Sequence, residues 1–261
     1  MKIILKGRKE IKEKLQKDFF RFGPESYKNL LLWDEFEFDR LSHNNNEIIM
    51  TIQNYLISVT FDPDLIFNPI NINIDNPYQI DDSERWLGSY HRMQSPGMIT
   101  FYSKNLTHFF WYVILELINR NHSFNKEMVL DISERIINKT LYHELFHHYT
   151  DFNRIYTDHR SHYNLEMEEA LAVAFSRIYL GLEHVSSSLS TAFFEIAYNY
   201  SGQGYRDWIN YQSDNDFFEA LVNYASYPNI LRGKYSSNVY EICKQNLQSI
   251  VCNPNVELRI E

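Results

Sequence analysis

A short run of the sequence, TLYHELFHHYTDF at residues 140–152, holds two histidines four positions apart and a glutamate directly after the first. If the run is helical, each residue advances by about 100°, so the side chains of His143 and His147 leave the helix on one side, one turn apart. Two imidazoles in this arrangement can bind a single tetrahedral Zn²⁺ ion. Glu144 points beside that ion, where it can accept a proton from a metal-bound water molecule. The run therefore satisfies the HExxH pattern, whose spacing suits metal-assisted hydrolysis.

An exposed polar helix face that carries histidines by chance would show the same spacing. The residues around the run argue against this alternative, because the helix is otherwise apolar or aromatic and a buried imidazole needs a polar partner. These apolar and aromatic neighbours are Ile136, Ile137, Leu141, Leu145, Phe146 and Tyr149.

An open catalytic zinc site needs a third protein ligand, which we expect on a neighbouring helix. The stretch NLEMEEALAVAFSRIY, residues 164–179, offers three glutamates. Glu166 lies on the polar side of the predicted helix, and Glu168 lies among bulky apolar side chains. Glu169 is flanked by small side chains that leave room for a metal ion, and a carboxylate there is costly unless a positive charge meets it. We therefore favour Glu169 over Glu168, and Glu168 over Glu166. An acidic first turn that complements the helix dipole is the alternative, and it explains Glu166 better than Glu169.

HExxH followed further along the chain by the glutamate of EEALA resembles the gluzincin-type zinc metallopeptidases. In those enzymes two helices supply His, His and Glu to one zinc ion, and the glutamate is often followed by a small residue, any residue and alanine, as in EALA at residues 169–172. The likeness covers residues 141–176. Its motif indicates zinc-dependent hydrolysis but does not indicate which substrate is hydrolysed. It departs from several such families at Val173, where they place an Asp that supports a histidine. The metzincin pattern does not fit, because its third histidine would fall at Asn153.

The resemblance implies a mechanism and further site residues. Zinc held by His143, His147 and Glu169 lowers the pKa of its bound water. Glu144 takes the proton, the hydroxide attacks a peptide carbonyl, and Glu144 returns the proton to the leaving amine. Asp151 can replace the missing Asp by accepting the far N–H of a ligand imidazole, or it can be a solvated residue at the helix end. An oxyanion-stabilising group is also needed, for which we favour Tyr235 over the other candidates, His148, His159, His162, His184 and Tyr205.

Composition and charge narrow the class of protein. The 261 residues are 44% hydrophobic and 23% charged, as in a globular protein with one large domain or two closely packed ones. A net charge of -9 argues against nucleic acid as the main partner, because phosphate binding needs a basic surface. Cys243 and Cys252 lack the spacing of a ligand pair and are expected to be free thiols. The N-terminus does not resemble a secretory signal, and the apolar run at residues 109–118 suits a buried helix rather than a membrane span, so a cytoplasmic location is the default expectation.

Hydrophobic patterning predicts an α+β chain in two regions. Residues 1–123 are expected to form a mixed N-terminal part with a small sheet, and residues 124–261 a mainly helical part with the active-site helices. Residues 97–123 could form one continuous catalytic domain with the second region. The strand predicted at residues 98–102 would, by the resemblance, offer its edge to an extended substrate, with residues 86–97 supplying the neighbouring strand and turn.

The remaining helices and strands are predicted from helix-capping residues and from the Gly, Pro and Ser residues that interrupt regular structure. Residues 47–61 fit either a helix or a strand, and the long helix capped by Ser123 is either continuous or broken midway. We expect further strands at residues 2–6 and 71–74, helices at 9–22, 105–120, 123–148, 164–181, 213–225 and 236–251, a linker at 186–190 and a turn at 201–205.

The leading hypothesis is thus a zinc endopeptidase that acts on protein or peptide. Two alternatives remain: an interaction module in which the metal serves structure only, and a zinc hydrolase of another amide bond, such as an exopeptidase or amidase. Structural zinc sites usually close the coordination shell with a fourth protein ligand, often Cys, and no cysteine lies near the run. His148 could close such a shell.

Overall fold

The computed structural model describes most of the chain, namely residues 7–42, 44–63, 86–91, 96–157, 165–183, 187–199, 207–224, 245, 247–248 and 254–261. Its α-helices are α1 (Arg8–Arg21), α2 (Glu35–Ser42), α3 (Asn45–Ser58), α5 (Ser103–Asn119), α6 (Lys126–Thr157), α7 (Leu165–Glu183), α8 (Ser188–Asn199) and α10 (Asp214–Tyr224). The described 3₁₀ helices are η1 (Glu25–Tyr27), η2 (Leu30–Leu32) and η4 (Asp207–Tyr211), and the strands are β1 (Gly88–His91), β2 (Gly97–Phe101) and β3 (Val256–Ile260).

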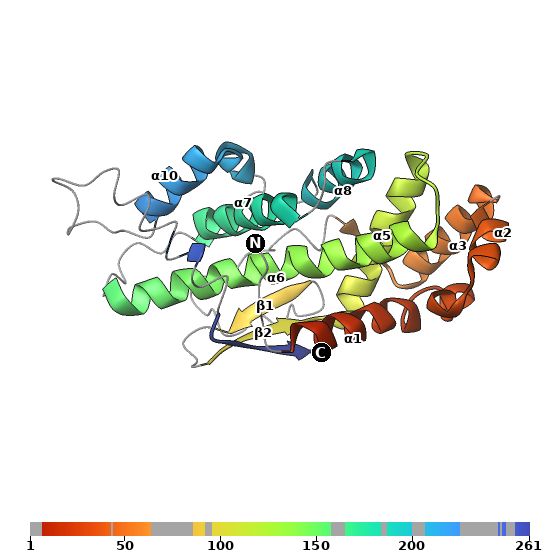
Figure 1. The fold of residues 1–261 in the computed structure, drawn as a ribbon, viewed down its shortest axis with the longest axis horizontal. Coiled ribbons are helices and arrows are strands. Elements are labelled where there is room, and N and C mark those ends of the chain that lie inside the picture. The colour runs from red at the N-terminus through yellow and green to blue at the C-terminus, as the bar shows by residue number, and fades with distance from the viewer. Residues whose placement is uncertain are drawn as a thin grey trace.

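The long helix α6 runs through the middle of the molecule (Figure 1). The sheet and α1 lie along one side of it, whereas α7, α8 and α10 lie along the other (Figure 1). The chain is mostly helical with one small three-stranded sheet, so the coarse α+β prediction is confirmed. α6 therefore contacts both layers, and side chains on its opposite faces meet different elements.

The sheet has the order β1-β2-β3, with β1 antiparallel and β3 parallel to β2. The strand predicted at residues 98–102 is β2, and β1 forms within the neighbouring stretch expected to pair with it. β2 is the central strand, with both edges taken by β1 and β3. The prediction that its edge pairs with substrate is therefore wrong. β3, which was not predicted from the sequence, brings residues 256–260 into the sheet.

The apolar run at residues 109–118 lies in α5, whose side chains are almost all buried, so the predicted buried helix is confirmed. α5 packs against α1, α3, α6 and α8. The Trp111 indole N–H donates to the Phe19 carbonyl at 2.8 Å, and the Phe19 and Phe110 rings stack with their centroids 4.9 Å apart. A Cβ atom at Gly23 would collide with the Trp111 indole, so this close turn after α1 requires glycine.

Several helix boundaries differ from prediction for local reasons. The ambiguous residues 47–61 form α3, because Ile48, Ile52 and Leu56 recur with the helical period and are all buried. α6 is continuous and ends at Thr157, and the Asn125 side chain rather than Ser123 accepts a backbone N–H in its first turn.

The serines near residue 187 also act differently from the prediction. The expected linker at residues 186–190 is wrong, because Ser188 begins α8 and the Ser187 hydroxyl accepts the Ser190 N–H. The predicted cap of α10 is confirmed, since the Ser213 hydroxyl accepts the Asp216 N–H. Asn105, by contrast, is not a cap. α5 begins at Ser103, and the Asn105 amide donates to the Trp86 carbonyl.

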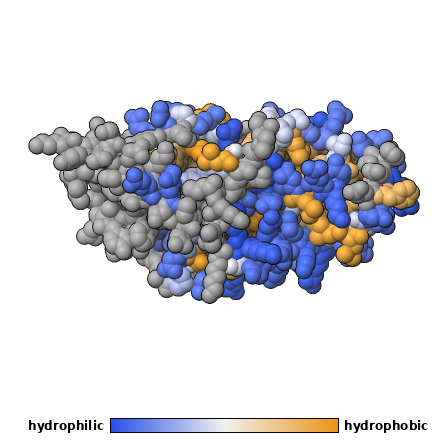
Figure 2. Space-filling model, viewed as in Figure 1, coloured by the Kyte–Doolittle hydropathy of each residue, from blue (hydrophilic) through white to orange (hydrophobic). Residues whose placement is uncertain are grey.

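Other predictions fall outside the described residues: the strands at 2–6 and 71–74, the turn at 201–205, most of the helix at 236–251, and both cysteines. Among the residues that are described, no helix has the length and apolar character needed to cross a membrane. The coloured atoms of the face shown in Figure 2 are mostly hydrophilic, with apolar residues exposed toward the end built from α2 and α3. Exposed large apolar side chains of η2, α2 and α3 are Leu32, Phe36, Met50 and Ile57.

Candidate metal centre

The side chains of His143, His147 and Glu169 meet between α6 and α7. His143 Nε2 lies 3.0 Å from Glu169 Oε2 and 3.3 Å from His147 Nε2. His147 Nε2 lies 3.5 Å from the same Glu169 oxygen. One ligand atom from each residue falls within 4.8 Å of the others, a spacing at which the three could hold a metal ion. The structure thus brings together the three residues that the sequence analysis selected as ligands.

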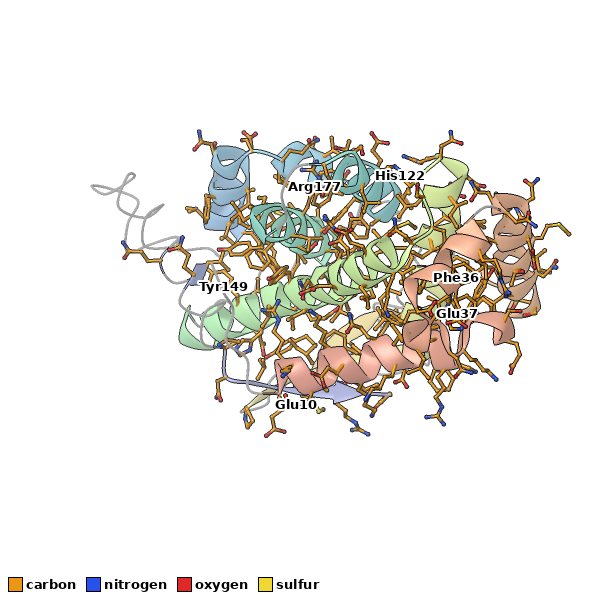
Figure 3. All side chains as sticks on the ribbon, turned by 45° about the vertical axis from the view of Figure 1, so that its right-hand side comes forward. Glu10, Phe36, Glu37, His122, Tyr149 and Arg177 are labelled. Atoms are coloured by element: carbon orange, nitrogen blue, oxygen red, sulfur yellow. The ribbon has the colours of Figure 1, made fainter. Side chains whose placement is uncertain are left out.

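Aromatic and small side chains hold α6 and α7 at the distance this cluster needs. The Phe146 ring on α6 lies 5.7 Å from the Phe175 ring on α7, centroid to centroid. Beside Glu169 on α7, the small side chains of Ala170 and Ala172 are buried. Side chains fill the space between the two helices, and Tyr149, labelled in Figure 3, is buried in this region.

The cluster is electrostatically polarised. Burial lowers the pKa of His147, but the carboxylates of Glu169 and Glu168 outweigh burial and raise this pKa to about 10. Burial acts to raise the pKa of Glu169, yet His147 and His143 outweigh it and hold this pKa well below its usual value. Both shifts have one cause, the attraction between a protonated imidazole and the carboxylates beside it, so the site favours a positive charge at this place.

Glu144 leaves α6 on the side that faces β1. Its side chain is buried, and burial raises its pKa, while His143 and His147 partly oppose that increase. A Cβ atom at Gly88 would lie 2.6 Å from Thr140 Cγ2 and 3.3 Å from Glu144 Oε1. Glycine at this position therefore lets the strand backbone pass directly beside Glu144.

Glu168 lies on the far side of His147 from the ligand cluster. Its side chain is fully buried, and its Oε1 accepts the Nδ1–H of His147 at 2.7 Å and the Thr150 hydroxyl at 3.0 Å. Its Oε2 accepts the Tyr224 hydroxyl from α10. This role of Glu168, considered from the sequence as a metal ligand, could not be predicted, because its partners come from two other helices. The one available signal was the apolar sector of α7, in which a carboxylate must find partners.

For Asp151 the sequence left two interpretations open, and the structure supports neither: the Nδ1 of His147 contacts Glu168 instead, and Asp151 is not solvated. Asp151 is buried and accepts the Tyr90 hydroxyl at 3.0 Å, and Tyr90 lies 3.2 Å from His148 Nδ1. Burial lowers the pKa of His148, against the opposing effect of Asp151. These three side chains form a separate polar group between β1 and α6.

The other sequence candidates lie elsewhere. Glu166 is exposed on α7. Tyr235, our first choice for oxyanion stabilisation, lies outside the described residues, as do His159, His162, His184 and Tyr205.

No family model matches this chain, and comparison with curated proteins and with solved structures finds no significant match. The function must therefore be inferred from the arrangement of the side chains themselves.

Proposed function

We propose that the protein is a zinc-dependent metallopeptidase, with His143, His147 and Glu169 as metal ligands and Glu144 as general base. The observation that supports this most directly is the convergence of two imidazole nitrogens and one carboxylate oxygen within 4.8 Å. Two histidines and one glutamate are a typical donor set of catalytic zinc, and three protein donors leave one tetrahedral position for water or substrate.

The charge balance of the site favours a divalent cation. The carboxylates of Glu144, Glu168 and Glu169 share a largely buried region with two imidazoles. Without metal, a proton on His147, whose pKa is raised to about 10, supplies part of the compensating charge, and a divalent cation can take the place of that proton. Burying several carboxylates without compensating charge is unfavourable. Because its Nδ1–H is donated to Glu168, a neutral His147 presents a lone pair on Nε2, toward His143 and Glu169. A dication offsets the negative charge and accepts this lone pair.

A structural role for the metal has less support. Structural zinc sites usually have four protein ligands. The candidate for a fourth was His148, but its Nδ1 contacts Tyr90, and the group identified among the described residues has three members. An open coordination position suits hydrolysis better than a purely structural site.

When bound, zinc would supply Lewis-acid chemistry, acidifying a water molecule and polarising a carbonyl group. The carboxylate of Glu144 would hold the proton taken from that water and deliver it to the leaving amine. Burial raises the pKa of Glu144 and so brings this carboxyl group toward the range in which it can both accept and donate a proton. Its place between the imidazoles and β1 suits this role.

A peptide is the substrate class that the neighbouring strand favours. β1 lies at the end of the sheet order, so among the described residues no strand pairs with its outer edge. Gly88 brings this strand against Glu144. An extended peptide could add to the edge through main-chain hydrogen bonds. We therefore move the proposed substrate edge from residues 98–102 to β1.

Replacing Glu144 by Gln tests the proposal. The variant should retain zinc, measured by metal analysis after loading and dialysis, but should no longer cleave a mixed peptide library that the wild type cleaves. His143→Ala should lose both the zinc and the cleavage. Glu166→Gln is the matched control, because Glu166 is exposed on the same helix as Glu169, and it should change neither. A wild-type protein that binds no zinc after loading would overturn the proposal.

A further inference from the structure

We propose that Glu168 and Tyr224 are positioning residues of the metal centre, through which α10 sets its metal affinity. Glu168 would fix the orientation and tautomer of His147, and Tyr224 would hold Glu168 in place. This inference rests on the proposed zinc site, but it concerns residues that donate no ligand atom to it.

The hydrogen bond to His147 has a defined chemical consequence. The imidazole donates its Nδ1–H to Glu168 Oε1 at 2.7 Å, so its Nε2 is left as the nitrogen that can bind metal. A carboxylate in this position also makes the imidazole a stronger donor to the metal. Glu168 and Glu169 are adjacent on α7, and their carboxylates meet opposite nitrogens of the His147 imidazole. Glu168 Oε1 contacts Nδ1, and Glu169 Oε2 lies near Nε2.

Glu168 needs further donors because it is fully buried. A buried carboxylate without hydrogen-bond donors is costly. The Thr150 hydroxyl, one turn after His147 on α6, lies 3.0 Å from the oxygen that His147 contacts and 3.0 Å from the His147 carbonyl oxygen, and it shares its single hydrogen between these two acceptors. Tyr224 donates to the other oxygen. With both oxygens held, the carboxylate has one orientation, and that orientation faces His147.

α10 is anchored so that it can deliver Tyr224 to this place. The Phe217 ring lies 6.2 Å from both the Phe146 ring of α6 and the Phe175 ring of α7, measured between centroids. Leu221, one turn later, is fully buried. Tyr224 follows on the same face of the helix, because positions separated by seven residues make two turns. A helix that supplies no ligand is thereby connected to the metal centre by one hydroxyl group.

Tyr224→Phe tests the inference, because it removes the hydroxyl and keeps the ring. We expect zinc affinity, measured by competition with a chromophoric chelator, to fall by about tenfold, the lower end of the 10–100-fold range typical of direct partners of ligand histidines, because Tyr224 acts through Glu168. The absorption spectrum of the Co²⁺-loaded variant should also change. Tyr198→Phe is the control: it removes a hydroxyl that contacts Ser176, further along α7, at 3.2 Å, and should leave zinc affinity unchanged.

The possible outcomes separate this inference from the proposed function. Wild type that binds zinc, with Tyr224→Phe of equal affinity, overturns the inference and leaves the metallopeptidase proposal standing. Wild type that binds zinc but cleaves no peptide overturns the peptidase reaction, while the affinity comparison still decides the inference. Wild type that binds no zinc overturns both. Should Tyr224→Phe not fold, Glu168→Gln removes the charge of the carboxylate that faces His147, and an unchanged zinc affinity in that variant contradicts the inference equally.

Discussion

The hydrogen atom in place of a side chain at Gly88 lets β1 lie directly against α6 at the proposed general base. A methyl group there would lie 2.6 Å from Thr140 Cγ2, closer than side-chain carbons pack. We expect Gly88→Ala to push the strand away from the helix and to lower the free energy of unfolding by about 1–3 kcal/mol, a typical cost of overpacking. Urea denaturation followed by circular dichroism measures this change.

Gly181→Ala provides the matched control for that substitution. Gly181 lies in α7, and an added Cβ atom there would meet nothing within 4 Å. Alanine favours the helix over glycine by about 1 kcal/mol, so this variant should be slightly more stable than wild type. Equal stability of Gly88→Ala and wild type would show that the strand tolerates the extra atom and does not depend on glycine.

For individual residues, the sequence predicted best those side chains whose positions depend on the spacing within one helix. The positions of His143, His147 and Glu144 follow from the period of one helix, and the small neighbours of Glu169 pointed to the face of α7 that meets them. The role of Glu168 could not be predicted in the same way. Its partners His147 and Tyr224 are 21 and 56 positions away along the chain, and only helix packing brings them together.

The helices and strands differ in the same way: some could be predicted from their own residues, and others depend on contacts with distant parts of the chain. α7 follows from the periodicity of its own apolar residues, and the cap of α10 from Ser213, whereas the pattern of residues 47–61 fitted either a helix or a strand and only the structure shows α3 there. β3 could not be predicted in this way, because its alignment with β2 depends on a partner from the first half of the chain. The serines before α8 were interpreted as a linker, although a serine hydroxyl is equally suited to cap a helix, as Ser187 does.

The contact between α3 and α5 contains a histidine with a lowered pKa. The His108 ring lies 5.9 Å from the Tyr55 ring and 6.3 Å from the Phe61 ring, centroid to centroid. Burial, and secondarily the charge of Lys104, lower the pKa of His108 from 6.5 to about 4. Between these two values the unfolded chain binds a proton here that the folded chain does not, so stability falls as the pH falls from about 6.5 to about 4.

His108→Phe should reduce this sensitivity to acid, because phenylalanine suits the aromatic contact and binds no proton. Urea unfolding of both proteins at several values between pH 4 and pH 7 measures the slope of stability against pH. Other titrating groups, including those of the metal centre, are common to both proteins, so the difference in slope isolates His108. Parallel slopes for the two proteins would mean that His108 is not protonated differently in the folded and unfolded chains.

For the molecule as a whole, α6 joins the two layers (Figure 1), because it contacts the sheet on one side and α7 on the other. The proposed metal ligands lie on both sides of the α6–α7 contact, so a bound ion would hold the two helices together. Zinc should therefore stabilise the folded chain. At a free zinc concentration of about 100 times the dissociation constant, the gain is about 2.7 kcal/mol if the unfolded chain binds none. For a domain of this size we expect the melting temperature to rise by about 5–10 °C.

Thermal unfolding in zinc buffers, compared with the protein in chelator, measures this rise. His143→Ala and Glu169→Ala should show almost none of it, because each removes a ligand, whereas Glu144→Gln should keep it, because the proposed general base is not a ligand. Since zinc can also bind weakly to unfolded histidines, His122→Ala is the control for non-specific binding: His122 is half-buried and lies away from the cluster (Figure 3), and its loss should leave the rise intact. A rise that is equal in wild type and in both ligand variants would locate zinc binding away from the α6–α7 contact.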